Sequence, residues 1–484
     1  MRKMIGIILF ILLFSPCFAL NEPLTILGVV QKLLEHDPEI RISMESLRLA
    51  ETNYRKSLAD GAPSFKLTDT GYSLYKSRFQ ATNTFNLGLG YSQKIPTSGT
   101  LSVTVENGIS VRSEEGKDQN TYSQTPSFSL TWSQPFLLNG KLIDTEAFAA
   151  GQRKAEIDKF RAKEDNSLSM NSGIVAAISN FFDVINLRKT ISYQENRLAW
   201  ERMDLVYLEE KLRLKLTTET AVWEKKLTIG DLEETLYGLK LDLTKSGNTL
   251  THSLGIENLA DYVLDESLPA YEQSVTDGEL SRRVMSANPS VVKEILALEK
   301  ARLETITSDV SFAPTLSTSF SFEPSYPTSL PWADAVPKSI SNFWHKDADY
   351  DLILSFLFTI PIDDGGKRSL TRDAGRSSEA TASQTLIMRK ALTLRDLQFN
   401  LLKRENIKEK ISLLMDYVEL RRKQLDNQKK LYEFKQITEH ALSFAELDLE
   451  NQQNRLWRAR ADLLSANLEL TSMTGESLAA QFAR

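Results

Sequence analysis

Apolar residues recur every three or four positions through two long stretches of this chain, 136–268 and 362–484, and neither stretch contains proline. In the first, a spacing of seven joins Val184, Ile191, Leu198, Leu205 and Leu212. In the second, the same spacing joins Leu442, Leu449, Leu456, Leu463 and Leu470. Heptads of this length are typical of coiled coils. They predict long antiparallel helices, the first on the order of 110 Å long if it runs from 142 to 214.

Alternation of apolar and polar residues replaces the heptads at 63–135 and 314–361. The run "DYDLILSFLFTI" puts Leu352, Leu354, Phe356, Phe358 and Ile360 on one face of a strand. Such strands fit a transmembrane barrel with a watery lumen, and they equally fit the half-buried strands of a soluble sheet. One chain offers four strands, or six if an extra hairpin around "IPTSGT" joins the sheet. The smallest barrels need about eight strands, so a barrel requires several chains.

The chain is an internal duplication. Thr25, Pro38 and Pro63 recur 251 residues later as Thr276, Pro289 and Pro314, and further along the register holds at 220 residues. Each copy therefore reads as a short helical region, strands and a long helical hairpin. The predicted segments are a signal peptide (1–19), a helix (20–62), strands (63–135), a hairpin (136–268), a second helix (269–313), second strands (314–361) and a second hairpin (362–484).

The same polar signature marks the turn of both hairpins, "KLTTETA" in the first copy and "KQITEHA" in the second. The threonine of each is placed to cap the following helix, and the lysine and glutamate complement the dipoles of the two helix ends. Capping alone is enough to explain these residues. We favour the interpretation that they cap the helices and also contact a partner. The candidate docking residues are Lys215, Thr218, Glu219, Lys435, Thr438 and Glu439.

The first nineteen residues are typical of a secretory signal peptide, with a basic start, an apolar centre and a small-residue end. The only cysteine, Cys17, lies within it, and Pro16 fits a lipid-anchor site poorly. Removing Arg2 and Lys3 from the 58 basic residues leaves 56 against 64 acidic ones, a net charge of −8. This balance does not favour nucleic acid as a partner.

The sequence does not favour an enzyme. The four histidines, His36, His252, His345 and His440, are scattered without metal-ligand spacing, so we expect no metal and no cofactor. Two acidic residues, Glu323 and Asp351, fall on the polar faces of predicted strands. They are candidates to line a lumen, although ordinary solvation explains them as well.

Short motifs repeated in order resemble the TolC family of outer-membrane efflux proteins: "EHDPEI" and "SANPSV", "GAPSF" and "FAPTL", "SQPFLLNGK" and "TIPIDDGGK", "SLG" and "MTG". The resemblance implies an α+β membrane protein. It would form a homotrimer with a 12-stranded barrel in outer-membrane lipid, continuous with a periplasmic coiled-coil tunnel. It also implies that the hairpin tips dock a periplasmic adaptor and an inner-membrane transporter. Lys215 and Lys435 stand where the family usually has glycine, and the first strand region is longer than usual.

We therefore expect a passive exit duct from periplasm to outside, gated near the tips and energised by a pump. The alternative is a periplasmic coiled-coil scaffold or adhesin with no channel activity.

Overall fold

A computed structural model describes residues 23–77, 80–115, 121–136, 145–269, 277–308, 312–328, 349–360, 362 and 365–482. The predicted signal peptide, Cys17 and Thr276 lie outside these residues. The chain divides into two compact units. The helical unit comprises Met1–Glu45, Lys163–Val292 and Met388–Arg484, and the sheet unit comprises Ser46–Ala162 and Lys293–Ile387.

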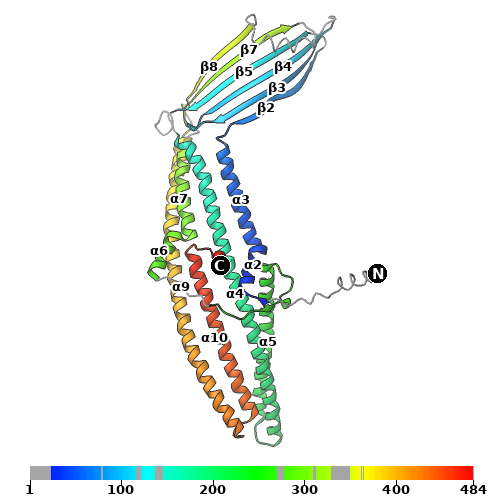
Figure 1. Ribbon diagram of the computed structural model, residues 1–484, viewed down its shortest axis with the longest axis vertical. Helices are drawn as coiled ribbons and strands as arrows, with labels where there is room; N and C mark the ends of the chain where they lie inside the picture. The colour runs from blue at the N-terminus through cyan, green and yellow to red at the C-terminus, as the bar shows by residue number, and fades with distance from the viewer. Residues whose placement is uncertain are drawn as a thin grey trace, which may run out of the picture. The chain divides into compact units, whose positions relative to one another are not determined.

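Long helices dominate the chain, as the heptads predict (Figure 1). Two of them, α4 and α9, have 68 and 67 residues, and each is followed through a short turn by a helix of about half that length. The described helices are α2 (Ile26–His36), α3 (Pro38–Ala59), α4 (Glu146–Arg213), α5 (Glu219–Leu254), α6 (Asp277–Ala287), α7 (Pro289–Ser308), α9 (Lys367–Glu433), α10 (Glu439–Met473) and α11 (Leu478–Phe482), with a 3₁₀ turn η1 (Leu259–Asp261).

The first hairpin is held together by its heptad positions. Ile191 and Leu198 of α4 are buried against Ile229, Leu232 and Leu236 of α5. Removing these side chains from water is the main force that pairs two such helices. The prediction that the long helices pack through their heptads is confirmed for this hairpin.

A larger apolar core lies where several helices of the helical unit meet. It contains Leu33 of α2, Phe181 and Phe182 of α4, Leu254 of α5 and Leu468 of α10. Among the described residues, one helix, α4, is apolar and long enough to cross a membrane by length and composition, with 44% of its apolar window buried. Its buried side chains from Ile174 to Ile185 lie in this core, so packing inside the protein accounts for them.

The duplication is visible in equivalent contacts within the helical unit. Gly255 ends α5 in a left-handed conformation against His36, and Gly475 follows α10 in the same conformation against Ala287. Thr25 caps α2, and its hydroxyl accepts from the amide of Gly28 at 3.1 Å.

The sheet unit carries one antiparallel six-stranded sheet in the order β2-β3-β4-β5-β7-β8 (Figure 1). The strands are β2 (Ser64–Lys76), β3 (Gln80–Lys94), β4 (Thr100–Glu114), β5 (Thr121–Pro135), β7 (Thr315–Thr328) and β8 (Asp349–Thr359). Two short strands of the helical unit, β1 (Pro23–Leu24) and β6 (Val263–Leu264), form a separate parallel pair.

The expectation of about four strands per chain is wrong, and the option of six is confirmed. The additional pair arises because the first copy places β3 and β4 between β2, which follows Pro63, and β5, which precedes α4. The turn "IPTSGT" joins these two strands, and there the amide of Ile95 donates to the carbonyl of Gly99 at 2.9 Å.

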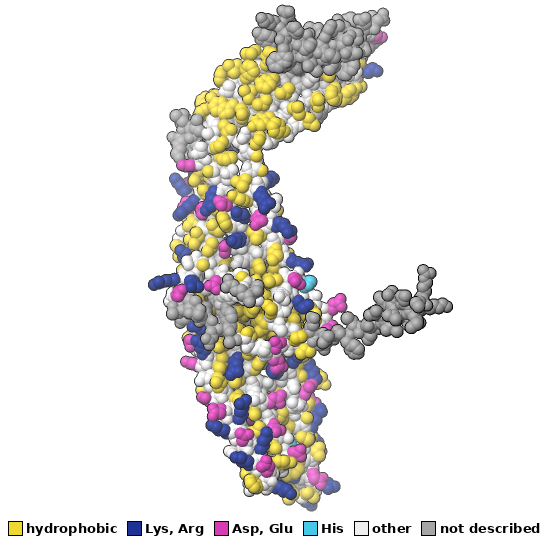
Figure 2. All heavy atoms as spheres, in the orientation of Figure 1, with side chains coloured by type: hydrophobic (Ala, Val, Ile, Leu, Met, Phe, Trp, Pro, Cys, Tyr) yellow, Lys and Arg dark blue, Asp and Glu magenta, His cyan; other side chains and the backbone are white. Residues whose placement is uncertain are grey.

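One face of this sheet is apolar across all six strands. The register places one residue of each strand in a single row, Leu67, Leu89, Val105, Phe128, Phe322 and Leu352. In the single chain Leu67 and Leu89 are 65% and 62% exposed. The opposite face has rows of small polar residues, such as Thr104, Ser129 and Ser321. Figure 2 shows the hydrophobic side chains gathered over the strands.

Candidate functional site at the hairpin tips

Lys215 closes the first hairpin turn in a left-handed backbone conformation, with φ of 59°. Its amide donates to the carbonyl of Leu212 at 2.9 Å, and the amide of Leu216 donates to that of Lys211 at 2.8 Å. These two bonds form a Schellman motif, which satisfies carbonyls at the end of α4 that have no helical partner.

The second hairpin repeats this turn at Lys435, with φ of 57°. The amide of Lys435 donates to Tyr432 and that of Gln436 donates to Leu431, both at 2.8 Å. Glycine is the usual residue at this position because a Cβ disfavours the left-handed region by about 1–2 kcal/mol. Lysine therefore occupies a strained position in both copies, and strain that persists at equivalent places suggests a functional role.

The threonines after each turn act as caps, as the sequence predicts. Thr218 precedes α5, and its hydroxyl accepts from the amide of Ala221 at 3.4 Å. Thr438 precedes α10 and accepts from Ala441 at 3.3 Å. Glu219 and Glu439 occupy the first turns of these helices, where the helix dipole favours a negative charge. The capping role is confirmed, and docking remains a prediction.

Large apolar side chains flank the strained lysines and are exposed in the single chain. Leu214 and Leu216 are 57% and 70% exposed, and Phe434 is 74% exposed. A turn that is always in contact with water is expected to carry polar residues. Exposed apolar groups gathered in one place commonly mark an interaction surface instead. Each tip thus presents a cation beside uncovered apolar surface.

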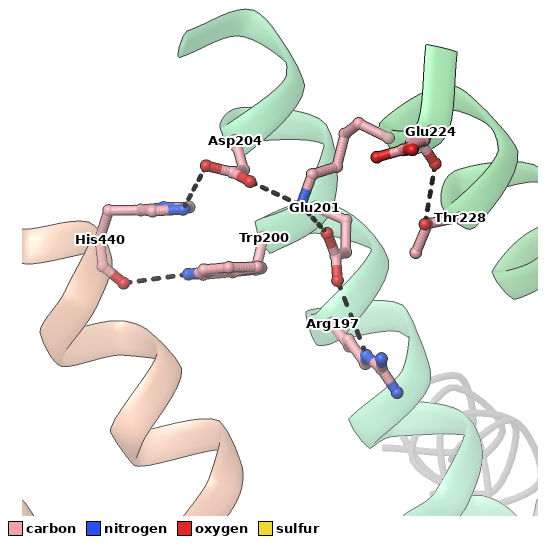
Figure 3. A network of polar contacts seen from close by, with 8 residues as sticks. Arg197, Trp200, Glu201, Asp204, Glu224, Thr228 and His440 are labelled. Atoms are coloured by element: carbon pink, nitrogen blue, oxygen red, sulfur yellow. Dashed lines mark hydrogen bonds and ion pairs between the residues drawn. The ribbon is translucent and has the colours of Figure 1, made fainter. Parts of the chain in front are cut away.

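A contact joins the two hairpins between the first turn of α10 and a residue of α4 that lies thirteen positions before the end of that helix (Figure 3). The ring of Trp200 in α4 stacks on the ring of His440 in α10, with centroids 4.2 Å apart and an interplanar angle of 7°. The indole Nε1–H also donates to the carbonyl of His440 at 3.0 Å. Phe444 packs against Trp200 with ring centroids 4.8 Å apart.

A half-buried ion cluster adjoins this stack and adds α5 to it. The Nζ of Lys225 lies 2.7 Å from Glu201 and 2.6 Å from Asp204, and Nε2 of His440 lies 3.4 Å from Asp204 (Figure 3). Burial lowers the pKa of Lys225, but its hydrogen bonds to Asp204 and Glu201 outweigh burial and raise it above the ordinary value. Lys225 is therefore a cation that holds two carboxylates of α4 against α5.

Sequence reasoning missed Trp200, Glu201, Asp204, Lys225 and His440 as a group. Glu201, Asp204 and Lys225 are charged residues of heptad helices, where charges are ordinary. One signal was present, since His440 lies within the tip signature "KQITEHA" of the second copy.

The two lumen candidates lie opposite each other in the sheet. Glu323 of β7 pairs with Asp351 of β8 in the register, so both belong to the polar face. The side chain of Asp351 is exposed in the single chain. Their role in a lumen remains a prediction. In the described part of the chain, no three His, Cys, Asp or Glu side chains are grouped to hold a metal ion.

No family model matches the sequence, and no curated protein matches it either. Solved structures do match along nearly the whole chain. The CmeC outer membrane channel of Campylobacter jejuni has 11% identity and a TM-score of 0.61, covering 93% of this chain and 85% of that one. VceC of Vibrio cholerae has 12% identity and a TM-score of 0.58, with 93% and 96% covered. The open-state MtrE channel of Neisseria gonorrhoeae has 12% identity and a TM-score of 0.60, with 96% and 93% covered.

At these identities the likeness shows the fold, and it shows it over both copies of the repeat. This chain has the fold of outer-membrane channels, so the resemblance to the TolC family is confirmed for the fold.

Proposed function

We propose that this chain is the outer-membrane exit duct of a tripartite efflux or type I secretion system. Three copies form a passive conduit from the periplasm to the outside. An inner-membrane pump supplies the energy through a periplasmic adaptor that docks at the hairpin tips. The observation that carries this proposal is the apolar face of the six-stranded sheet, which is exposed in the single chain.

An apolar face of this kind suits lipid. Soluble proteins rarely leave contiguous apolar patches of more than a few hundred Å² in water. The opposite face is small and polar, which suits a watery lumen. The alternative of a periplasmic scaffold or adhesin accounts for the long helices but leaves this face without a counterpart.

The tips support docking of an adaptor. Lys215 and Lys435 place a positive charge beside exposed leucine and phenylalanine side chains, while the mature chain as a whole is acidic. A partner surface with carboxylates around an apolar centre would complement both features. The stack of Trp200 on His440 and the cluster around Lys225 join the two hairpins beside the second tip, which is where we place the gate.

Two neighbouring residues of β8 provide a test of the lipid face. Leu354 lies on the apolar face and Ser355 on the polar one. A lysine on a lipid-facing position of a barrel costs about 2–4 kcal/mol at the membrane centre, and a lumen position tolerates it. We expect Leu354→Lys to reduce the amount of protein that carbonate washing leaves in the outer membrane, and Ser355→Lys to leave it unchanged.

The channel itself is tested in planar lipid bilayers. The purified protein should produce stepwise ionic conductance, and heat-denatured protein should not. Equal effects of the two lysines, together with an absence of conductance, would favour the scaffold.

A further inference from the structure

The two outer strands of the sheet each leave one side without a partner among the described residues. In the order β2-β3-β4-β5-β7-β8, β2 bonds only to β3, and β8 bonds only to β7. These edges have similar lengths, 13 and 11 residues. Each presents a row of backbone amides and carbonyls that another strand can pair with.

The edge at β8 lacks the protection that exposed edges of soluble sheets have. Proline and charged residues normally interrupt such edges to prevent pairing with another chain. From Leu352 to Thr359, β8 contains neither. Its second face is mixed, because Ile353 and Leu357, which are 52% and 64% exposed, alternate there with Ser355 and Thr359. This composition suits a strand that has neighbours on both sides.

The directions of the two edges match. Because all five pairings are antiparallel and the strands number six, β2 and β8 run in opposite directions. The β8 edge of one copy can therefore pair antiparallel with the β2 edge of the next, and the alternation continues around a ring without a break. An odd number of strands would force a parallel joint.

A single chain does not provide enough strands to close alone, since the smallest membrane barrels have about eight. We infer that β8 of each copy pairs with β2 of its neighbour and that three sheets of six strands close into one barrel of eighteen. This inference rests on the trimer of the proposed function. It replaces the twelve strands that the family resemblance implies. Since barrel diameter grows roughly linearly with strand number, the ring is about half again as wide as a twelve-stranded one.

Cysteine pairs at the two edges test the joint. In a Cys17→Ser background, one cysteine replaces Phe65 or, in a second series, Tyr72, both on the apolar side of β2. Each is combined with a cysteine at one of four β8 positions on the same face, Leu352, Leu354, Phe356 or Phe358. Two starting points on β2 allow for an unknown stagger between copies. Val103 in the central strand β4 replaces the β2 position as the control.

We expect that, in at least one of the two β2 series, oxidation of membranes converts most of the protein into a covalent trimer. This should happen when the second cysteine is at one or two adjacent β8 positions. The Val103 series should stay monomeric. A closed ring of three gives the trimer as the largest product. The inference is overturned if all eight pairs stay monomeric, if the cross-link forms within one chain, or if larger ladders appear. If one of these results is found for a particle that still contains three chains and conducts ions, only the strand pairing is wrong and the proposed function is retained. A single chain that is soluble without detergent would remove both.

Discussion

The indole ring of Trp200 lies flat against the imidazole of His440, with centroids 4.2 Å apart and planes 7° apart. Trp200 belongs to α4 and His440 to the first turn of α10, so the stack joins the first hairpin to the second beside the second tip. Aromatic pairs add to the packing free energy beyond the area they bury.

Replacing this tryptophan should loosen the joint between the hairpins. We expect Trp200→Ala to lower the free energy of unfolding by about 2–4 kcal/mol, because the contacts with His440 and Phe444 are lost. Trp223 of α5 is 60% exposed, and Trp223→Ala should change stability by no more than about 0.5 kcal/mol. Denaturant unfolding followed by helical circular dichroism measures both, and equal losses would contradict a specific role for the stack.

The neighbouring residues Lys225 and Lys226 allow a structural ion cluster to be compared with an ordinary surface ion pair. Lys225→Met removes the cation that Asp204 and the buried Glu201 share and leaves Glu201 with the more distant Arg197, at 3.9 Å, which should cost about 2–4 kcal/mol. Lys226 pairs with Glu209 at 2.9 Å, but both side chains are about half exposed. Lys226→Met should therefore cost less than about 1 kcal/mol. The same unfolding assay distinguishes the two, and a neutral Lys225→Met would remove the cluster from our account of the gate.

Gly475 has no room for a side chain. A Cβ there would lie 2.3 Å from the carbonyl oxygen of Ala287, and the backbone has φ of 77°. We expect Gly475→Ala to destabilise the protein by at least about 2 kcal/mol, because strain adds to a clash with the backbone. Gly230 lies inside α5 with no atom within 4 Å of the added Cβ, so Gly230→Ala should stabilise it by up to about 1 kcal/mol. Opposite signs in thermal unfolding are the expected result.

Burial raises the pKa of Glu164 above its ordinary value of 4.5, although Lys163 opposes the effect. The folded state then holds the proton more tightly than the unfolded state. This group's contribution to stability is complete below pH 4.5 and is lost as the pH rises through the folded-state pKa. Glu164→Gln carries no such loss, so its stability relative to the natural protein should rise between pH 4 and pH 7.

Glu419 provides the matched control, because its hydrogen bond with Lys423 lowers its pKa. Its contribution is present at neutral pH and is lost as the pH falls, so Glu419→Gln should show a small effect of opposite sign. Unfolding free energies across this pH range test the pair. An unchanged difference between natural protein and Glu164→Gln would show that burial does not govern this carboxyl.

Substitutions of the two strained lysines distinguish the effect of backbone strain from the effect of charge. Lys215→Gly and Lys435→Gly should each stabilise the protein by about 0.5–1 kcal/mol, because glycine tolerates a positive φ, whereas alanine at the same positions should not. Both glycine and alanine remove the charge. Cross-linked complexes with a periplasmic partner should therefore decrease in both variants and persist with arginine. If the yield of cross-linked complexes does not depend on the charge at these two positions, the lysines are not the docking residues.

The sequence predicts best what depends on local periodicity. The heptads that place Ile191 and Leu198 in the hairpin core, and the threonines that cap α5 and α10, follow from spacing along one helix. The left-handed lysines could be located from the repeated signature, but their conformation becomes clear only in the turn.

Features that depend on distant pairing were not predictable in the same way. The strand number stayed open because the sequence does not show whether the hairpin around "IPTSGT" joins the sheet. In the structure, the register of β2 is also irregular between Thr68 and Gly71. The stack of Trp200 on His440 joins residues 240 positions apart in the sequence, and no periodicity relates them.

The most direct test of the account is the mass of the particle extracted from outer membranes, measured by light scattering and corrected for bound detergent. We predict three chains per particle and extraction only with detergent, because the apolar face of each sheet must stay covered. One or two chains per particle, soluble without detergent, would contradict the channel and favour the periplasmic scaffold.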